Sequence, residues 1–266
     1  MGIKFGPAGI GSVKEAESVL EEYHKKGIQA AEIPFTYAVF IKHKEDAVRI
    51  GKKAKELGIE LSIHAQYWIN LNSEEKEKRE ASMKRILDCC EMGHYLGVKV
   101  VVFHAGYYTN KGLNGEDKEK SYQTIKSAVE EIMKTIKQKK WDIQIAAETM
   151  GRVNVFGSIE EVSRLVKETG CGFCIDFAHI LAREKEVDYE KIEKLFPQKE
   201  WHCHFSGIVY GEKGEKHHKK TEKEAWRELI KNIKHLEKSK NLRIINEAPT
   251  PFEDSVEGLK IYEKLK

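Results

Sequence analysis

The 266-residue chain contains no run of about 18 apolar residues, the length that a membrane-spanning helix requires. Its first segment, MGIKFGPAGIGSVKEA, lacks the apolar stretch of a secretory signal. The cysteines number five, and Cys89 and Cys90 are adjacent, so the pattern is not that of a disulfide framework. These absences predict a cytoplasmic protein that does not bind membranes.

Neither sign of charge dominates, because 46 Lys and Arg residues face 43 Asp and Glu residues, a net charge of +3. The chain as a whole is neither a polyanion nor strongly basic. Contact with a nucleic acid would therefore have to come from a local patch of basic side chains. The apolar residues, 40% of the chain, are enough for the core of one large fold.

Cys171 and Cys174 match the C-x-x-C spacing of redox-active pairs. They lie within the apolar run CGFCIDF, which favours a buried strand over the strand-to-helix turn of a redox motif. A pair of buried structural thiols is the stronger interpretation, and redox chemistry is the alternative.

Short runs rich in Val, Ile and Phe alternate with amphipathic stretches along the whole chain. Such runs are typical of parallel strands that are buried on both faces. We expect strands at residues 3–5, 28–33, 59–64, 98–104, 143–148, 172–176, 201–205 and 242–247. Eight units in this chain give about 33 residues each, the size of a strand, a loop and a helix.

Eight strand–helix units of this size predict an α/β protein with a (β/α)8 TIM barrel, a fold of about 250 residues. We expect residues 1–266 to form a single TIM-barrel domain. A doubly wound open sheet is the alternative. The stretch 206–220 has no apolar period and is predicted to be a long loop, which in compact domains is usually functional or disordered.

Functional residues of such a barrel lie at the carboxyl ends of its strands. Metal-binding residue types occupy these positions here, namely His64, His104, Glu148, Asp176, His179, His202, His204 and Glu247, and the loop after the seventh strand adds Glu215, His217 and His218. Carboxylates gathered at one rim repel one another unless cations lie between them. Imidazole and carboxylate together suit zinc or a related divalent ion. So many donors predict several ions, an arrangement suited to hydrolysis of a phosphate ester.

These segments resemble endonuclease IV, a family of zinc-dependent apurinic/apyrimidinic endonucleases built on a TIM barrel. The matching segments are HAQYWIN from His64, Phe103-His104 with Gly106, Glu148-Thr149 with Gly151, CIDFAH from Cys174, Glu215-Lys-His217, and Glu247. The resemblance extends from the third strand to the last and is weaker over the first 50 residues.

The resemblance implies about three zinc ions per chain, with manganese or iron as alternatives. The implied ligand sets are His64, His104 and Glu148; Glu148, Asp176, His202 and Glu247; and His179, Glu215 and His217. Here His202 is preferred to His204, because its 13-residue spacing to Glu215 fits the family pattern.

The resemblance also implies the reaction, which is cleavage of double-stranded DNA on the 5′ side of an abasic site by a monomer, with Glu148 and Glu247 as catalytic residues. Tyr67 and Trp68 match the family's DNA-probing position, and aromatic side chains can stack in the gap left by a missing base. Packing at the rim is the alternative for this pair. Backbone phosphates would favour the basic residues of this face, Lys111, Arg152, Arg183, Lys213, Lys216, Lys219 and Lys220.

The sequence departs from the family in four places. The segment IKFGPAGIG lacks the usual His and Ser, and EIPFTYAVF lacks the Asn-x-Arg pattern. Glu215-x-His217 replaces Asp-x-His, and the segment after His179 reads ILAREKEVDY in place of a run of small residues and Gly-Tyr-Asp. Two other functions therefore stay open. A sugar isomerase or epimerase of the xylose isomerase-like superfamily would use Glu148, Asp176, His202 and Glu247 on one metal ion and would leave the other donors without a role. A metal-loaded barrel that binds damaged nucleic acid without cutting it is the third.

Overall fold

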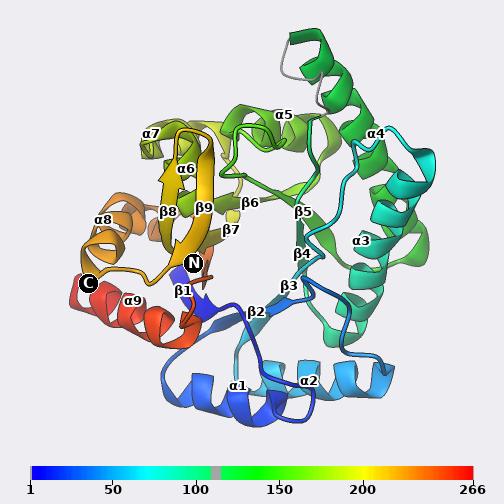
Figure 1. Cartoon of the computed structure of the whole chain (residues 1–266). Coiled ribbons are helices and arrows are strands. Elements are labelled where there is room, and N and C mark those ends of the chain that lie inside the picture. The colour runs from blue at the N-terminus through cyan, green and yellow to red at the C-terminus, as the bar shows by residue number, and fades with distance from the viewer. Residues whose placement is uncertain (1, 109–114, 266) are drawn as a thin grey trace.

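The computed structural model describes residues 2–108 and 115–265. Eight parallel strands form one sheet in the order β1-β10-β7-β6-β5-β4-β3-β2, with helices around it (Figure 1). The strands of this sheet are β1 (Gly2–Pro7), β2 (Ala30–Pro34), β3 (Glu60–His64), β4 (Val100–Phe103), β5 (Gln144–Glu148), β6 (Gly172–Asp176), β7 (Glu200–Phe205) and β10 (Asn241–Asn246). Each overlaps a strand that the sequence predicts, and the predicted TIM barrel is confirmed.

The helices follow the strands in the alternation that the sequence predicts. They are α1 (Ala16–Lys25), α2 (Lys44–Glu56), α3 (Lys76–Leu96), α4 (Gly115–Lys139), α5 (Ile159–Thr169), α6 (Phe177–Glu184), α7 (Tyr189–Leu195), α8 (Lys223–Ile233), which continues into a 3₁₀ turn (Lys234–Lys238), and α9 (Pro251–Leu265). None of the helices in the described part of the chain is long and apolar enough to cross a membrane.

The ring of strands closes between β1 and β2. The backbone N–H of Gly9 donates a hydrogen bond to the carbonyl oxygen of Glu32 at 2.8 Å, just beyond the end of β1. A Cβ atom on Gly6 would lie 1.8 Å from the carbonyl oxygen of Ala30. Glycine at position 6 therefore allows the two backbones to approach closely enough to complete the barrel.

The main apolar core lies between the strands and the helices, while the inside of the barrel holds a smaller cluster. Val100, Val102 and Ala146 belong to this inner cluster, whereas Val101 and Phe103 belong to the main core. Successive side chains of a strand point to opposite faces, so this alternation identifies the inward-facing positions. The inward side chains on either side of the inner cluster are largely polar, and they continue to the site described below.

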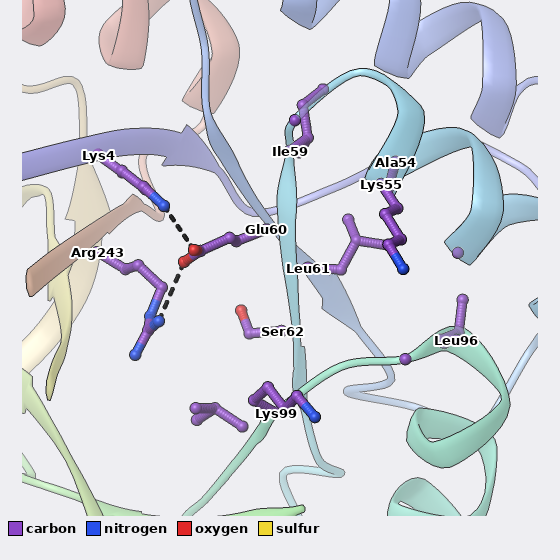
Figure 2. A pocket seen from close by; sticks show the side chains of 14 residues that line it. Lys4, Ala54, Lys55, Ile59, Glu60, Leu61, Ser62, Leu96, Lys99 and Arg243 are labelled. Atoms are coloured by element: carbon purple, nitrogen blue, oxygen red, sulfur yellow. Dashed lines mark hydrogen bonds and ion pairs between the residues drawn. The ribbon is translucent and has the colours of Figure 1, made fainter. Parts of the chain in front are cut away.

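An ion-pair group lies at the amino end of the barrel, opposite the functional rim. Glu60 Oε1 is 2.5 Å from Lys4 Nζ, and Glu60 Oε2 is 3.0 Å from Arg243 Nη1, as the dashed lines in Figure 2 show. They border a pocket of about 520 Å³. Because these charges already pair with one another, and because this end of a TIM barrel serves stability, we assign the group a structural role.

The predicted loop at residues 206–220 is instead a β-hairpin, which corrects the sequence-based expectation. Its strands are β8 (Gly207–Gly211) and β9 (Gly214–Lys219), which pair antiparallel beside α6 (Figure 1). Ile208 packs against Ala178 and Ala182 of that helix. Most other hairpin residues are polar and partly or fully exposed, so the hairpin has no apolar alternation that would reveal its strands in the sequence.

Candidate metal centre

The carboxyl ends of the strands bring together most of the predicted donors. His64 ends β3, Glu148 ends β5 and Asp176 ends β6, while His104 and Glu247 follow β4 and β10 directly. His64, Glu148 and Asp176 are buried, and His104 and Glu247 are partly buried. Parallel strands end at the same rim of a barrel, so donors that are far apart in sequence meet there.

Glu148 lies at the centre of the site and contacts four histidines. Its Oε2 is 3.1 Å from His64 Nε2 and 2.9 Å from His104 Nε2. Its Oε1 is 3.2 Å from the Nδ1 atoms of both His179 and His204. Each carboxylate oxygen thus faces two imidazoles, so Glu148 links two groups of potential metal donors.

A second group of donors adjoins Glu148. One ligand atom from each of Glu148, Asp176, His204 and Glu247 lies within 4.8 Å of the others. Asp176 Oδ1 accepts the backbone N–H of His179 at 2.8 Å and so begins α6. Asp176 Oδ2 is buried and makes no hydrogen bond in the described residues, although it lies 3.2 Å from His179 Nδ1 as an ion pair. A buried carboxylate oxygen with free acceptor capacity fits a cation site.

A third group forms where the hairpin meets α6. Glu215 lies 3.4 Å from His179, measured from Oε2 to Nε2, and 3.9 Å from His218, measured from Oε1 to Nε2. Donor atoms of the three residues lie within 4.8 Å of one another. A hydrogen bond orients the ring of His218, since its Nδ1 is 2.6 Å from the hydroxyl of Ser206.

Two glycines bring the hairpin close to the rim. The backbone N–H of Glu215 donates to the carbonyl oxygen of Gly151 at 3.1 Å. A Cβ atom on Gly214 would lie 2.0 Å from that oxygen, and one on Gly151 would lie 2.8 Å from the Cβ of Glu215. Both positions therefore need glycine for the hairpin to deliver Glu215 to the site.

A sequence model of the family described as xylose isomerase-like TIM barrel matches residues 20–264. The chain belongs to this family. An uncharacterized protein of Methanocaldococcus jannaschii, MJ0133, is 34% identical over 278 residues and covers 98% of this chain and 97% of its own. A probable endonuclease 4 of Mycobacterium marinum is 24% identical over 146 residues, which are 55% of this chain and 54% of its own.

Among the solved structures that share this fold, two are named after different enzymes. A D-tagatose 3-epimerase-like protein has a TM-score of 0.73 at 20% identity and covers 98% of this chain and 97% of its own. Endonuclease IV from Thermus thermophilus has a TM-score of 0.69 at 18% identity and covers 100% of both chains. Identities this low show a shared fold, so the reaction has to be inferred from the site of this family member.

Charge within the site favours ionised carboxylates. Burial on its own raises the pKa of Glu148, but the charges of His104 and His204 hold it well below 4.5. Burial likewise opposes ionisation of Glu247, whose pKa the charge of His204 lowers to about 2. Burial prevails at Asp176 and raises its pKa. Glu148 and Glu247 are thus held in the ionised form, in which a carboxylate can bind a cation.

The histidines respond in the opposite sense. Burial lowers the pKa of an imidazole, but the hydrogen bond and the charge of Glu148 raise that of His64 to about 9. The charge of Asp176, against the effect of burial, raises the pKa of His179 well above 6.5. Protons on these rings balance the carboxylates when no cation is bound, and a metal ion has to displace them in order to bind.

Two of the predicted ligands, His202 and His217, are not among the donors that gather around Glu148 and Glu215. In each case a nearby histidine on the same strand lies among those donors instead. His202 is buried in the barrel, with Nε2 bonded to Glu32 Oε2 at 2.8 Å, and His204 takes the place beside Glu148 and Glu247. On β7, His204 pairs with Asp176, whereas His202 pairs with Cys174, one layer deeper in the barrel. The 13-residue spacing to Glu215 is therefore a misleading guide.

His217 is the second correction, because it is exposed and His218 faces the site instead. Val209 pairs with His217 but the next residue, Tyr210, pairs with Glu215, so Lys216 is an extra residue in β9. This bulge reverses the alternation of side chains. Glu215 and His218, three residues apart, therefore reach the site together.

The donors predicted from the sequence did not include Glu32 of β2, which is fully buried and contacts both His202 and His204. A signal for it is present, since Glu32 is a charged residue inside the apolar run of a predicted strand. Carboxylates in buried strands are rare unless they are paired. A charge in such a position therefore indicates a buried partner.

The aromatic pair predicted to contact DNA lies at the mouth of the site. Tyr67 is 45% exposed and Trp68 is 48% exposed. Tyr67, together with His64, His104 and Glu247, lines a pocket of about 250 Å³. Both rings are thus accessible to a molecule that reaches the donors.

The basic residues predicted to line the rim divide into two kinds. Arg183 is largely buried and donates from Nη1 to the carbonyl oxygens of Arg152 and Val155 at 2.7 and 3.0 Å, so it braces the loop after β5. Lys111 lies outside the described residues. The exposed members are Arg152, Lys213, Lys216, Lys219 and Lys220.

The C-x-x-C pair has no redox geometry. Cys171 and Cys174 are buried and free, and Cys174 lies inside the barrel on β6. Burial raises the pKa of both thiols, so neither is a ready thiolate. The interpretation as structural thiols holds for both residues.

Proposed function

We propose that this family member is a metal-dependent phosphodiesterase of the endonuclease IV type, which cleaves DNA on the 5′ side of abasic sites. The observation that carries the proposal is the fourfold contact of Glu148, with two imidazoles at each oxygen. Such a carboxylate joins one donor group to the next. We infer about three divalent ions per chain, zinc in the first place and manganese or iron as substitutes.

The residues fit such ions by their chemistry. The proposed ligands are all imidazoles and carboxylates, namely His64, His104, Glu148, Asp176, His179, His204, Glu215, His218 and Glu247. Divalent ions bound here would orient a phosphodiester, activate water and stabilise the leaving oxygen. The charge of Glu148 holds the groups together, since neighbouring cations would otherwise repel one another.

Side chains at the pocket offer specific contacts to a bound DNA strand. Glu247 is partly exposed in the pocket, so its carboxylate could orient an attacking water molecule by accepting a hydrogen bond from it. Tyr67 and Trp68 offer exposed rings for stacking against a base next to the lesion. Arg152 lines the same pocket and offers a positive charge to a backbone phosphate.

A metal-dependent sugar epimerase is the second candidate. Glu148, Asp176, His204 and Glu247 form one compact donor group, and a single metal ion bound there would serve that reaction. The fold shared with the D-tagatose 3-epimerase-like protein supports this alternative. It leaves His64, His104, His179, Glu215 and His218 without a metal-binding role, which is why we prefer the phosphodiesterase.

Elemental analysis of protein purified without added metal, combined with two activity assays, tests the proposal. We expect about three ions per chain and cleavage of a duplex that contains one abasic site, at the phosphate on its 5′ side. The same preparation should not interconvert ketohexose epimers. One ion per chain together with epimerase activity would overturn the phosphodiesterase proposal in favour of the second candidate.

A further inference from the structure

Glu32 is a carboxylate in the middle of the barrel, with none of its surface exposed. The residues beside it on β2, Ala30, Ala31 and Ile33, are apolar and buried. A charge at this depth is strongly destabilising unless it is paired and hydrogen-bonded. The chemistry proposed above gives Glu32 no direct part, so its presence needs another explanation.

Three side chains surround this carboxylate. The hydroxyl of Ser62, which also lines the pocket in Figure 2, donates to Glu32 Oε2 at 2.8 Å. His202 Nε2 bonds to the same oxygen at 2.8 Å. The other oxygen, Oε1, lies 2.9 Å from His204 Nε2 as an ion pair, and neither atom has another hydrogen-bond partner in the described residues. Ser62 and His202 thus fix one oxygen and direct the other at His204.

The ring of His204 lies between Glu32 and the metal centre. Its Nε2 faces Glu32, while its Nδ1 is 3.2 Å from Glu148 Oε1 and 3.4 Å from Glu247 Oε2. A histidine that binds a metal through one ring nitrogen commonly donates the N–H of the other to a carboxylate. That contact fixes the tautomer and the orientation of the ring and makes the free nitrogen more basic.

We propose that Glu32 is a positioning residue, which keeps the proton of His204 on Nε2 and so presents Nδ1 to the ion bound by Glu148 and Glu247. The inference rests on the proposed function only for the ion itself. The hydrogen bonds from Ser62 and His202 hold Glu32 in place, which gives a role to the histidine that the site does not use directly.

The same residues could instead bind a metal ion inside the barrel, and the experiments below distinguish this arrangement from the proposed one. Cys174, His202 and His204 have donor atoms within 4.8 Å of one another, and His202 Nδ1 is buried without a hydrogen-bond partner in the described residues. An ion bound inside the barrel by these three residues would use a thiolate. In that case His204 Nε2 would be a ligand and could not donate to Glu32.

The first experiment needs no metal. In the metal-free chain with ¹⁵N-labelled histidine, at a pH high enough to leave the ring of His204 with a single proton, we expect that proton to be on Nε2, to exchange slowly, and to leave Nδ1 unprotonated. The signal is assigned through its loss in His204→Asn. Glu32→Gln and Glu32→Ala should accelerate the exchange of this proton. Asp254→Asn is the matched control, because Asp254 is a buried carboxylate that accepts the backbone N–H of Thr221 at 2.7 Å, away from the proposed ligands. A wild-type His204 without a proton on Nε2 overturns the proposal.

The second experiment measures zinc affinity against a competing chelator, with circular dichroism to establish that each variant is folded. We expect Glu32→Gln and Glu32→Ala to weaken the binding of one ion by about 10- to 100-fold. Asp254→Asn should bind as the wild type does. Unchanged affinity in both folded Glu32 variants overturns the positioning role.

Cobalt substitution distinguishes an ion bound inside the barrel by Cys174, His202 and His204 from an ion bound at the rim by Glu148 and Glu247. We expect the spectrum of the cobalt-loaded chain to lack a thiolate-to-metal charge-transfer band and to be the same in Cys174→Ser. A band that disappears in Cys174→Ser overturns the proposal, because it places an ion on the inner side of His204. A wild-type chain that binds no ion at all contradicts the proposed function, while the proton on His204 still decides the role of Glu32.

Discussion

The phenol ring of Tyr67 stacks on the imidazole of His104, with ring centroids 5.7 Å apart and an angle of 28° between the planes. Tyr67 therefore covers a proposed ligand and is still half exposed. Tyr37, 74% exposed in the loop after β2, contacts both Tyr67 and Trp68. These three rings form an aromatic surface beside the proposed ligands His64 and His104, which Tyr67 contacts.

Trp68→Ala should weaken binding of an abasic duplex and leave the metal content unchanged. Loss of one base-stacking ring costs about 1–3 kcal/mol, which corresponds to an increase in Kd of about 5- to 150-fold. Fluorescence anisotropy with a non-cleavable abasic analogue measures the effect, and Trp68→Phe should retain most of the affinity. Equal affinity of Trp68→Ala and the wild type would show that the ring only packs at the rim.

Glu148→Gln should be the most damaging substitution of a single proposed ligand. It removes the charge that faces four imidazoles, so we expect fewer bound ions and a loss of abasic-site cleavage by orders of magnitude, in a chain that still folds. Metal analysis, cleavage rates and circular dichroism of the variant provide the test. Cleavage near the wild-type rate would refute the bridging role of Glu148.

The ion near the hairpin should be the most weakly bound. Glu215 and His218 lie on a partly exposed hairpin, whereas His64 and Asp176 end buried strands of the barrel. His218→Ala should therefore lose one ion under mild chelation that leaves the wild type loaded. The neighbouring His217→Ala is the matched control and should keep the full metal count. The reverse result would favour His217 as the ligand.

Gly151→Ala should impair binding of the same ion without replacing any proposed ligand. The added Cβ would lie 2.8 Å from the Cβ of Glu215 and 3.1 Å from His179 Cδ2, so the hairpin has to move outward. Calorimetric zinc titration should show one weaker site and two unchanged ones. Three wild-type affinities in this variant would mean that the hairpin tolerates the contact.

The stability of the metal-free chain should fall as the solution becomes alkaline. The folded state raises the pKa of His64 from 6.5 to about 9, so its stabilising contribution is complete below pH 6.5 and is lost as the pH rises through about 9. Zinc needs unprotonated imidazoles, so the stabilisation by zinc should grow over the same interval. Thermal unfolding between pH 6 and 10, with chelator and with zinc, tests both the fall in metal-free stability and the growth in stabilisation by zinc.

His64→Asn should reduce the slope of stability against pH in the metal-free chain, because it removes the ring whose pKa the folded state raises. A wild-type slope of zero in the presence of chelator would contradict the proposed charge balance at the site.

The sequence by itself determined the barrel and the rim. Buried parallel strands need apolar runs of a certain length, and the helices between them need an apolar face, so both can be recognised locally. Donors such as His64 and Glu148 directly end or follow such runs, and this local order is enough to place them at the carboxyl ends of the strands.

Only the tertiary structure decided which histidine of each close pair faces the site. His202 and His204 share one face of β7, and their depth in the barrel depends on the pairing of β7 with β6, which is not a local property. His217 and His218 lie on opposite faces of β9, and the bulge at Lys216 selects His218. The role of Glu32 likewise depends on three side chains from other strands, which meet only when the barrel closes.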